Sequence, residues 1–233
     1  MKEKSTSLIF IPLMFLVSIL IIYKSQNLNI ETEHCKEESA VLSSNQITAD
    51  TESKDIINKS LEVIENQKNQ IDIATKEMNK KMAEIDSIQD KKEWFITYKS
   101  IVEKYEYLFD PPETIYNYYS SEELNLLFRV VQAEIGNYSF EQKCNVVSVI
   151  FNRINHEKFP DTMSEILVPS QFSTISNGSI YRVTVDEETI LACEYVFMFG
   201  DTTDGALFFD SNGALGYKYL FNDGAHNFYT TYK

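Results

Sequence analysis

The segment at residues 140–154 constrains the fold most strongly, because it is apolar on most of its faces and has to be buried. Ser139, followed three residues later by Gln142, forms a capping box that predicts where this helix begins. Its apolar residues include Cys144, Val146, Val147, Val149, Ile150 and Phe151. A helix of this kind predicts the centre of a domain, with the other elements packed around it.

A second predicted helix precedes it and ends on an acid. Ser120 and Glu123 form its capping box, and Gly136 follows its end. Its apolar stripe consists of Leu124, Leu127, Phe128 and Val131. Glu134 falls at the edge of this stripe, where a carboxyl group is disfavoured in its charged form and can hold a proton near neutrality, as a general acid must. The alternative is a helix-terminal Glu whose carboxylate reaches water.

The remainder of the domain predicts one more helix and three short strands. Thr184 and Glu187 form a third capping box, which would open a helix that stops at Gly200. Strands are expected at residues 206–209, 217–221 and 227–231, separated by Asn-Gly and Asn-Asp-Gly turns. Helices followed by a small antiparallel sheet give the α+β class.

Several short motifs in the C-terminal half carry a family resemblance. They include Asn152-Arg153, Gln171-Phe172-Ser173, Asn177-Gly178-Ser179-Ile180-Tyr181, Gly205-Ala206-Leu207 and Gly224-Ala225-His226-Asn227-Phe228-Tyr229. In that order and spacing, residues 122–231 resemble the SleB/CwlJ family of bacterial cell-wall hydrolases, which includes spore-cortex lytic enzymes. The resemblance aligns Glu134 with the family's catalytic glutamate. It implies a lysozyme-like arrangement in which helices flank a groove and the β part forms one wall.

The sequence departs from the family pattern at several positions. Asn137-Tyr138 stand where a Gly-Glu or similar pair often follows the catalytic glutamate, and Gln142 replaces a usual Gly. Asp210-Ser211 stand in place of Tyr-Asn, and Ala225 in place of the Asn before the His. These departures bear on substrate fit more than on the reaction.

The number of candidate acidic residues favours a reaction that needs one carboxyl group over a hydrolysis that needs two. A glycosidase that uses water normally needs two carboxyl groups. The sequence offers Glu134 but no second acid in comparable surroundings, because Asp161, Asp210 and Asp223 lie near predicted turns and are interpreted as loop residues. A lytic transglycosylase needs one acid, which protonates the leaving oxygen and then takes the proton of the muramic acid 6-hydroxyl. The family that the chain resembles includes lytic transglycosylases. We therefore expect a lytic transglycosylase that acts on the MurNAc-GlcNAc strand of peptidoglycan, with Glu134 as acid and then base.

The resemblance also implies residues that line the groove. They are Gln171, Phe172, Ser173, Tyr181 and His226. A structural hydrogen-bonding role for His226 is an equal alternative. Asn152 and Arg153 are expected to be structural, with Arg153 binding carbonyl groups left free at the C-terminal end of its helix.

No metal or other cofactor is expected. An N-acetylmuramoyl-L-alanine amidase, the first alternative, commonly holds zinc through several His and acid ligands, whereas the domain has only His156 and His226, at no ligand-like spacing.

A non-catalytic wall-binding tether is the second alternative. A net charge of -14 excludes the electrostatic pattern of a nucleic-acid binder, so capture of an anionic wall polymer would depend on hydrogen bonds and aromatic stacking.

The N-terminal region predicts a membrane anchor. Residues 1–24 contain an apolar run flanked by lysines with no small-x-small cleavage site after it, which is typical of an uncleaved single-pass signal anchor. The catalytic domain would then lie outside the cytoplasm, at the cell membrane. A cleaved signal peptide is the alternative.

A linker and a stalk are predicted between the anchor and the domain. Residues 25–53 are polar and aperiodic, as in a linker. Residues 54–109 predict a helical stalk that would span on the order of 80 Å if straight. One apolar position recurs every seven residues there, at Ile57, Ile64, Ile71, Met78 and Ile85. The pattern leaves a coiled coil, and self-association through it, open. The catalytic domain is predicted at residues 110–233, after an Asp-Pro-Pro break.

Overall fold

The computed structural model describes residues 51–213 and 216–231, which form two compact units. The predicted anchor and all but the last three residues of the predicted linker lie outside the described residues. Among the described residues, no helix is both long and apolar enough to cross a bilayer. The first unit comprises the described residues up to Gln89 together with Ile96–Pro111, and the second comprises Asp90–Phe95 and the chain from Pro112 onward.

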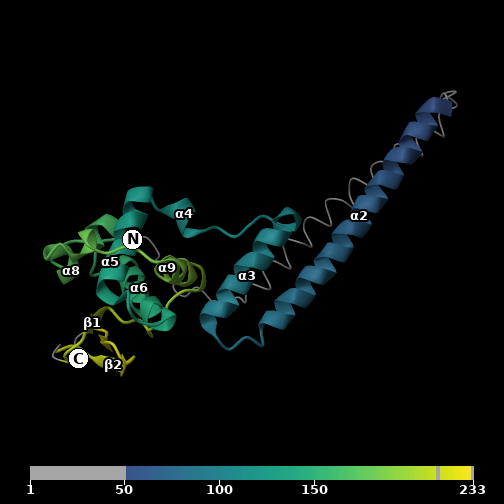
Figure 1. The fold of residues 1–233 in the computed structure, drawn as a ribbon. Helices are drawn as coiled ribbons and strands as arrows, with labels where there is room; N and C mark the ends of the chain where they lie inside the picture. Colours follow the sequence, from purple (N-terminus) through teal and green to yellow (C-terminus); the bar gives the residue numbers. More distant parts are fainter. Residues whose placement is uncertain (1–50, 214–215, 232–233) are drawn as a thin grey trace. The chain divides into compact units, whose positions relative to one another are not determined.

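The first unit is built from α2 (Thr51–Ile85), the later part of α3 (Lys91–Tyr105) and the 3-10 helix η1 (Glu106–Leu108). The chain turns between the two helices, and α3 runs back along α2 so that Lys104 Nζ lies 3.3 Å from Glu77 Oε1 (Figure 1). The predicted stalk at residues 54–109 is thus helical but folds into two helices, so the length estimated for a straight helix does not apply. Asp90 starts the second helix, because its side chain accepts a hydrogen bond from the backbone N–H of Glu93.

Three helices form the centre of the second unit: α5 (Ser121–Ile135), α6 (Phe140–Ile154) and α9 (Glu187–Phe199) (Figure 1). The capping boxes predicted at Ser120 and Ser139 are both present. Helix α6 packs against both α5 and α9, and most of its side chains are buried. The prediction that α6 is the central buried helix is confirmed.

The start of α9 differs from the prediction. Its N-cap is Asp186, whose side chain accepts from the backbone N–H of Thr189, and not Thr184. Both residues are good N-caps, but Asp186 is also held by contacts with α5 and α6, which a local sequence pattern cannot show. The helix stops at Gly200, as predicted.

Four short elements surround these helices and shape the surface of the unit. They are α4 (Ile115–Tyr118), α7 (Met163–Ile166), α8 (Ser173–Ser176) and the 3-10 helix η2 (Ser179–Tyr181). Both α8 and η2 pack against α5. The last turns of α5 therefore lie beside α8 and η2, and this junction contains Glu134.

A three-stranded antiparallel sheet completes the unit. Its strands are β1 (Phe208–Asp210), β2 (Tyr219–Asn222) and β3 (Asn227–Tyr229), in the order β1-β3-β2. Phe228 pairs with Phe209 on one side and Phe221 on the other, and it packs against Val149 of α6. The predicted order of helices followed by a small antiparallel sheet is confirmed, although each strand is shorter than predicted.

The segment Asp90–Phe95 belongs to the second unit through its contacts with α9. Lys92 forms an ion pair with Glu188. Trp94 meets Phe199 edge to face, with ring centroids 5.2 Å apart, and Phe95 packs in the same manner against Tyr195. The second unit thus contains this segment in addition to the chain from Pro112 onward, whereas the domain was predicted to begin at residue 110.

A buried lysine joins the helices at this end of the unit. Lys143 of α6 is 1% exposed, and its Nζ lies 3.1 Å from carboxylate oxygens of both Asp186 and Glu188. Burial alone would raise the pKa of Asp186, but hydrogen bonds from Thr189, Lys143 and Gln132 outweigh it, and the pKa is lowered. The ammonium group therefore holds both carboxylates in their charged form against α6.

We expect Lys143→Met to lower the free energy of unfolding of the second unit by roughly 1–3 kcal/mol, because the acids lose their buried partner but can still reach water. Trp94 is the sole tryptophan and lies in this unit, so its fluorescence during chemical denaturation of the full chain measures the change. Lys80→Met, at an exposed lysine of α2, is the control and should change this transition by less than about 0.5 kcal/mol. Equal stability of the two variants would contradict this role for Lys143.

Candidate active site

Glu134 lies in the last turn of α5 and is partly buried, at the edge of the apolar stripe, as predicted. Its Oε1 accepts a hydrogen bond of 2.6 Å from the hydroxyl of Thr174, a buried residue of α8. Within the described residues, the second oxygen, Oε2, has no hydrogen-bond partner. The carboxyl group is therefore fixed at one oxygen and available at the other.

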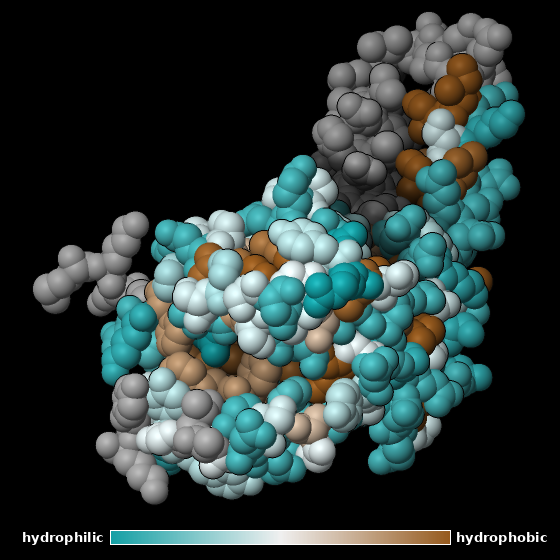
Figure 2. All heavy atoms as spheres, turned by 60° about the vertical axis from the view of Figure 1, so that its left-hand side comes forward, coloured by the Kyte–Doolittle hydropathy of each residue, from teal (hydrophilic) through white to brown (hydrophobic). Residues whose placement is uncertain are grey.

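A hollow of about 340 Å³ adjoins Glu134. It is lined by Gln132, Ala133, Glu134, Ile135, Gly136, Asn137, Tyr138, Val183 and Thr184. The surface of the unit in Figure 2 is also recessed, and hydrophobic side chains form part of the walls. The hollow places Glu134 where a ligand bound on the surface could reach its carboxyl group.

The predicted motif Gln171-Phe172-Ser173 lies directly before Thr174, and its three side chains have different surroundings. Gln171 is exposed, and its Oε1 accepts from Nη1 of Arg153 at 3.3 Å. Phe172 is 2% exposed and lies under the Arg153 guanidinium, so it supports the site from beneath. Ser173 is exposed at the first turn of α8.

Arg153 is buried in the penultimate position of α6 and is 5% exposed. Its Nε donates to the carbonyl of Leu207 at 2.7 Å. The prediction that it binds carbonyl groups at the end of its own helix is wrong, because Asn155 does so instead, through a hydrogen bond to the carbonyl of Phe151. Burial lowers the pKa of the Arg153 guanidinium to about 10, while Tyr217 and Glu134 act in the opposite direction.

Asn152 has the structural role that was predicted. Its side-chain amide donates to Asp201, Thr203 and the carbonyl of Ala206, at distances of 3.0 to 3.3 Å. These contacts fix the loop that leads from α9 into β1. Its neighbour Arg153 fixes the next residue, Leu207, so the pair holds the chain as it enters the sheet.

His226 lies in the turn before β3 and is 8% exposed. Its ring packs edge to face against Phe209, and its buried Nδ1 has no hydrogen-bond partner in the described part of the chain. Burial lowers the pKa of the imidazole, although Asp223, Glu134 and Asp210 act in the opposite direction. The influence of Glu134 shows that His226 belongs to the same electrostatic environment as the proposed acid.

Tyr181 is 77% exposed and does not line the hollow beside Glu134. It belongs to η2, which is tied to α5 by a hydrogen bond of 3.1 Å from Arg129 to the carbonyl of Ile180. The structure thus ties Gln171 to Arg153, places His226 within the electrostatic range of Glu134, and leaves Tyr181 exposed and outside the hollow.

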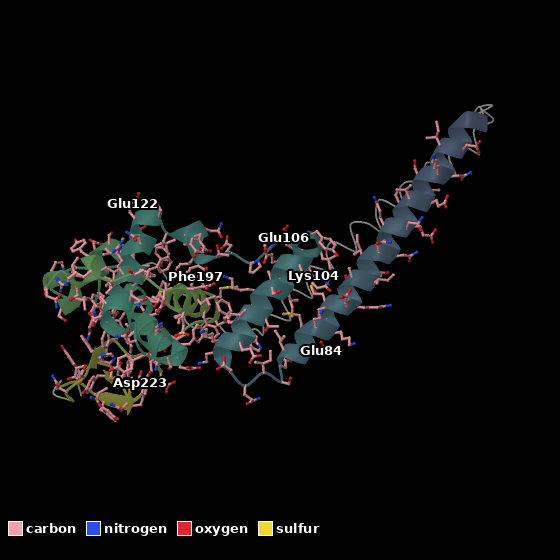
Figure 3. All side chains as sticks on the ribbon, in the orientation of Figure 1. Glu84, Lys104, Glu106, Glu122, Phe197 and Asp223 are labelled. Atoms are coloured by element: carbon pink, nitrogen blue, oxygen red, sulfur yellow. The ribbon has the colours of Figure 1, made fainter. Side chains whose placement is uncertain are left out.

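The remaining acids near the site are engaged in local structure or exposed. Asp223 accepts from the backbone N–H of Ala225 and His226 and holds the turn before β3 (Figure 3). Asp210 accepts from the hydroxyl of Tyr229 at 2.9 Å. Asp161 is exposed. Within residues 51–213 and 216–231, no group of three or more His, Cys, Asp or Glu is placed to hold a metal ion.

Thr174 is the site residue that the sequence did not reveal. It makes the direct contact to Glu134 across 40 positions of sequence. The one available signal was its place directly after Gln171-Phe172-Ser173, which marks the segment but not the residue.

Comparison with known proteins identifies the domain. The model of the Cell Wall Hydrolase family matches residues 137–231. These residues belong to the cell wall hydrolase family. The matched region begins three residues after Glu134, so the match does not extend to the proposed acid.

Individual relatives are consistent with this family. The chain is 33% identical over 64 residues to a spore cortex-lytic enzyme of Oceanobacillus iheyensis, an alignment that covers 27% of this chain and 23% of the relative. The chain thus spans less than a quarter of that protein's length.

Two solved structures are also similar. The catalytic domain of the germination-specific lytic transglycosylase SleB from Bacillus anthracis is 24% identical with a TM-score of 0.45, covering 50% of this chain and all of that one. The SleB catalytic domain of Bacillus cereus is 25% identical with a TM-score of 0.44, covering 49% of this chain and 94% of that one.

We expect Thr174→Val to slow the release of soluble fragments from purified peptidoglycan by about 10- to 100-fold, because a hydrogen bond to a charged group contributes about 1.5–3 kcal/mol. Val has the shape of Thr but lacks the hydroxyl that orients Glu134. Ser176→Ala, on the same short helix, removes a hydroxyl that contacts only the carbonyl of Ser173 and should keep the normal rate. A normal rate for Thr174→Val would show that the hydrogen bond has no part in the reaction.

The lowered pKa of His226 predicts a pH-dependent loss of stability. Below the ordinary histidine pKa of 6.5, the unfolded chain takes up a proton that the folded domain accepts only at lower pH, so stability falls as the pH drops from 7 toward 5. His226→Gln should flatten this dependence, whereas His156→Gln should keep it. Chemical denaturation followed by Trp94 fluorescence at each pH measures both, and an unchanged slope in His226→Gln would contradict the prediction.

Proposed function

We propose that the chain is a peptidoglycan-cleaving enzyme that acts on the glycan strand as a lytic transglycosylase. The observation that carries this proposal is the state of Glu134: it is partly buried beside a hollow, fixed through Oε1 by Thr174, and available at Oε2. A general acid needs a carboxyl group that is oriented toward the substrate and held against apolar surroundings. Membership of residues 137–231 in the cell wall hydrolase family supports peptidoglycan as the substrate.

The proposed reaction uses Glu134 twice. Protonated Glu134 first donates its proton to the glycosidic oxygen on C1 of muramic acid, and the bond between C1 and that oxygen breaks. The carboxylate then takes the proton of the muramic acid 6-hydroxyl, whose oxygen bonds to C1 and gives a 1,6-anhydro end. The second step restores the proton that Glu134 lost in the first, so one acid completes the cycle and no water is consumed.

The engagement of the neighbouring acids supports a single-acid mechanism. Asp223 uses its two carboxylate oxygens on backbone N–H groups and on the amide of Asn145. Asp210 Oδ1 is occupied by the hydroxyl of Tyr229 and the N–H of Gly213. Both carboxylates thus hold turns and strands, whereas Glu134 adjoins the hollow, which favours Glu134 alone as the acid.

We expect Glu134→Gln to lower fragment release by about 10²- to 10⁴-fold while leaving the fold intact, because Gln cannot donate a proton to the leaving oxygen. Glu122→Gln is the matched control, since Glu122 is exposed at the opposite end of the same helix (Figure 3). The full chain is incubated with purified peptidoglycan, and unfolding followed by Trp94 fluorescence confirms the fold of each variant. Near-normal release by a folded Glu134→Gln chain would exclude Glu134 as the acid.

Mass spectrometry of the released fragments distinguishes the reactions. A lytic transglycosylase gives fragments with 1,6-anhydro ends, which are lighter by one water than the reducing ends that a hydrolase gives. An amidase would release stem peptides from intact glycan strands, and a non-catalytic tether would bind the wall without releasing fragments. Any product other than anhydro-ended fragments would overturn the proposed reaction.

A further inference from the structure

The surroundings of Arg153 are unusual for a buried cation. Its guanidinium lies 5.3 to 5.5 Å from the ring centroids of Phe159, Phe172 and Phe208, within the range of cation–π attraction. It donates hydrogen bonds to the Leu207 carbonyl and to Gln171, and no carboxylate pairs with it among the described residues. The cation is thus held by aromatic rings and neutral oxygens, and one of those oxygens is on an exposed side chain.

The contact with Arg153 determines which way the amide of Gln171 points. A guanidinium has only donors, so the group that Gln171 turns toward it must be the carbonyl oxygen, Oε1. The amide NH₂ is therefore turned away from Arg153. Gln171 is exposed, and its Nε2 has no hydrogen-bond partner among the described residues. Arg153 thereby converts a side chain that can donate or accept into one that presents donors only.

Gln171 belongs to the same short segment as the residue that orients the proposed acid. Thr174 follows three positions later and donates to Glu134, while Phe172 between them packs under the Arg153 guanidinium. Gln171 is exposed and stands three positions before Thr174, so a ligand that reaches Glu134 would meet the donors of Gln171 next along the same segment.

We propose that Arg153 is a positioning residue that fixes the Gln171 amide as a donor for the N-acetyl carbonyl oxygen of the glycan strand. This inference rests on the proposed function, from which it takes peptidoglycan as the ligand. A carbonyl oxygen only accepts, which matches a side chain that only donates, whereas sugar hydroxyls do both. Removal of the acetyl group leaves an ammonium, a donor that the Gln171 amide cannot bind, so the site selects N-acetylated strands over N-deacetylated ones.

Two variants test this selectivity. Gln171→Glu keeps the size of the side chain and the contact with Arg153 but presents an acceptor, so it should bind acetylated peptidoglycan about tenfold less tightly and shift its preference toward deacetylated material. Arg153→Lys keeps the charge but loses the planar fork, which frees the Gln171 amide to turn, so it should lower the ratio of acetylated to deacetylated binding. Asn152→Ala is the control, because it removes neighbouring structural contacts and should lower stability without changing that ratio.

The readout is co-sedimentation of the full chain with insoluble peptidoglycan, either untreated or chemically N-deacetylated, measured in a Glu134→Gln background so that binding does not depend on cleavage. A Gln171→Glu chain that folds and keeps the original ratio overturns the proposal, as do equal ratios for Arg153→Lys and Asn152→Ala. Cleavage assays on the unmodified chain address the proposed function separately. Selective binding without cleavage would sink the proposed reaction alone, and cleavage without selectivity would sink this inference alone.

Discussion

The burial of α6 is the constraint on which the rest of the second unit depends. A helix buried on most of its faces must find a partner for each of its polar side chains, because an unpaired buried polar group is costly. The polar side chains of α6 bind partners outside the helix. Lys143 binds the start of α9, Asn145 binds the turn before β3, and Ser148 binds the loop after α9. Arg153 binds Leu207 directly before β1 and Gln171 shortly before α8. The hydrophobic face of α6 makes the core, and its few polar side chains determine where the surrounding loops lie.

The extent to which the sequence predicted the structure follows the range of the interactions. The capping boxes of α5 and α6 act within one helical turn, so their residues could be recognised directly. Thr184 was expected to start α9, but Asp186 does so because Lys143, 43 positions away, binds its carboxylate. Glu134 was found because its helix places it at the edge of an apolar stripe, whereas Thr174 depends on a contact between separate elements. The periodicity of a sequence shows which face of a helix is buried, but it does not show which residue of another segment will contact that face.

Neutral side chains account for most of the specific contacts around the proposed acid. In a chain with a net charge of -14, attraction of an anionic polymer by the overall field is not available. The surroundings of Glu134 instead contain a hydroxyl from Thr174, an amide from Gln171 and a His226 ring whose pKa is lowered by burial. Arg153 is a buried cation and acts on the surface through the amide of Gln171, whose oxygen it binds. Such a site distinguishes ligands by the placement of donors and acceptors more than by charge.

The ion pair between Lys92 and Glu188 has a consequence for how the protein folds as it is made. The two residues are 96 positions apart, and closing a loop of that length costs entropy before the contact returns any stabilisation. A ribosome delivers Asp90–Phe95 long before it delivers α9, so the contact of Trp94 with Phe199 forms only after most of this unit has been translated. The unit therefore closes only when α9 has emerged.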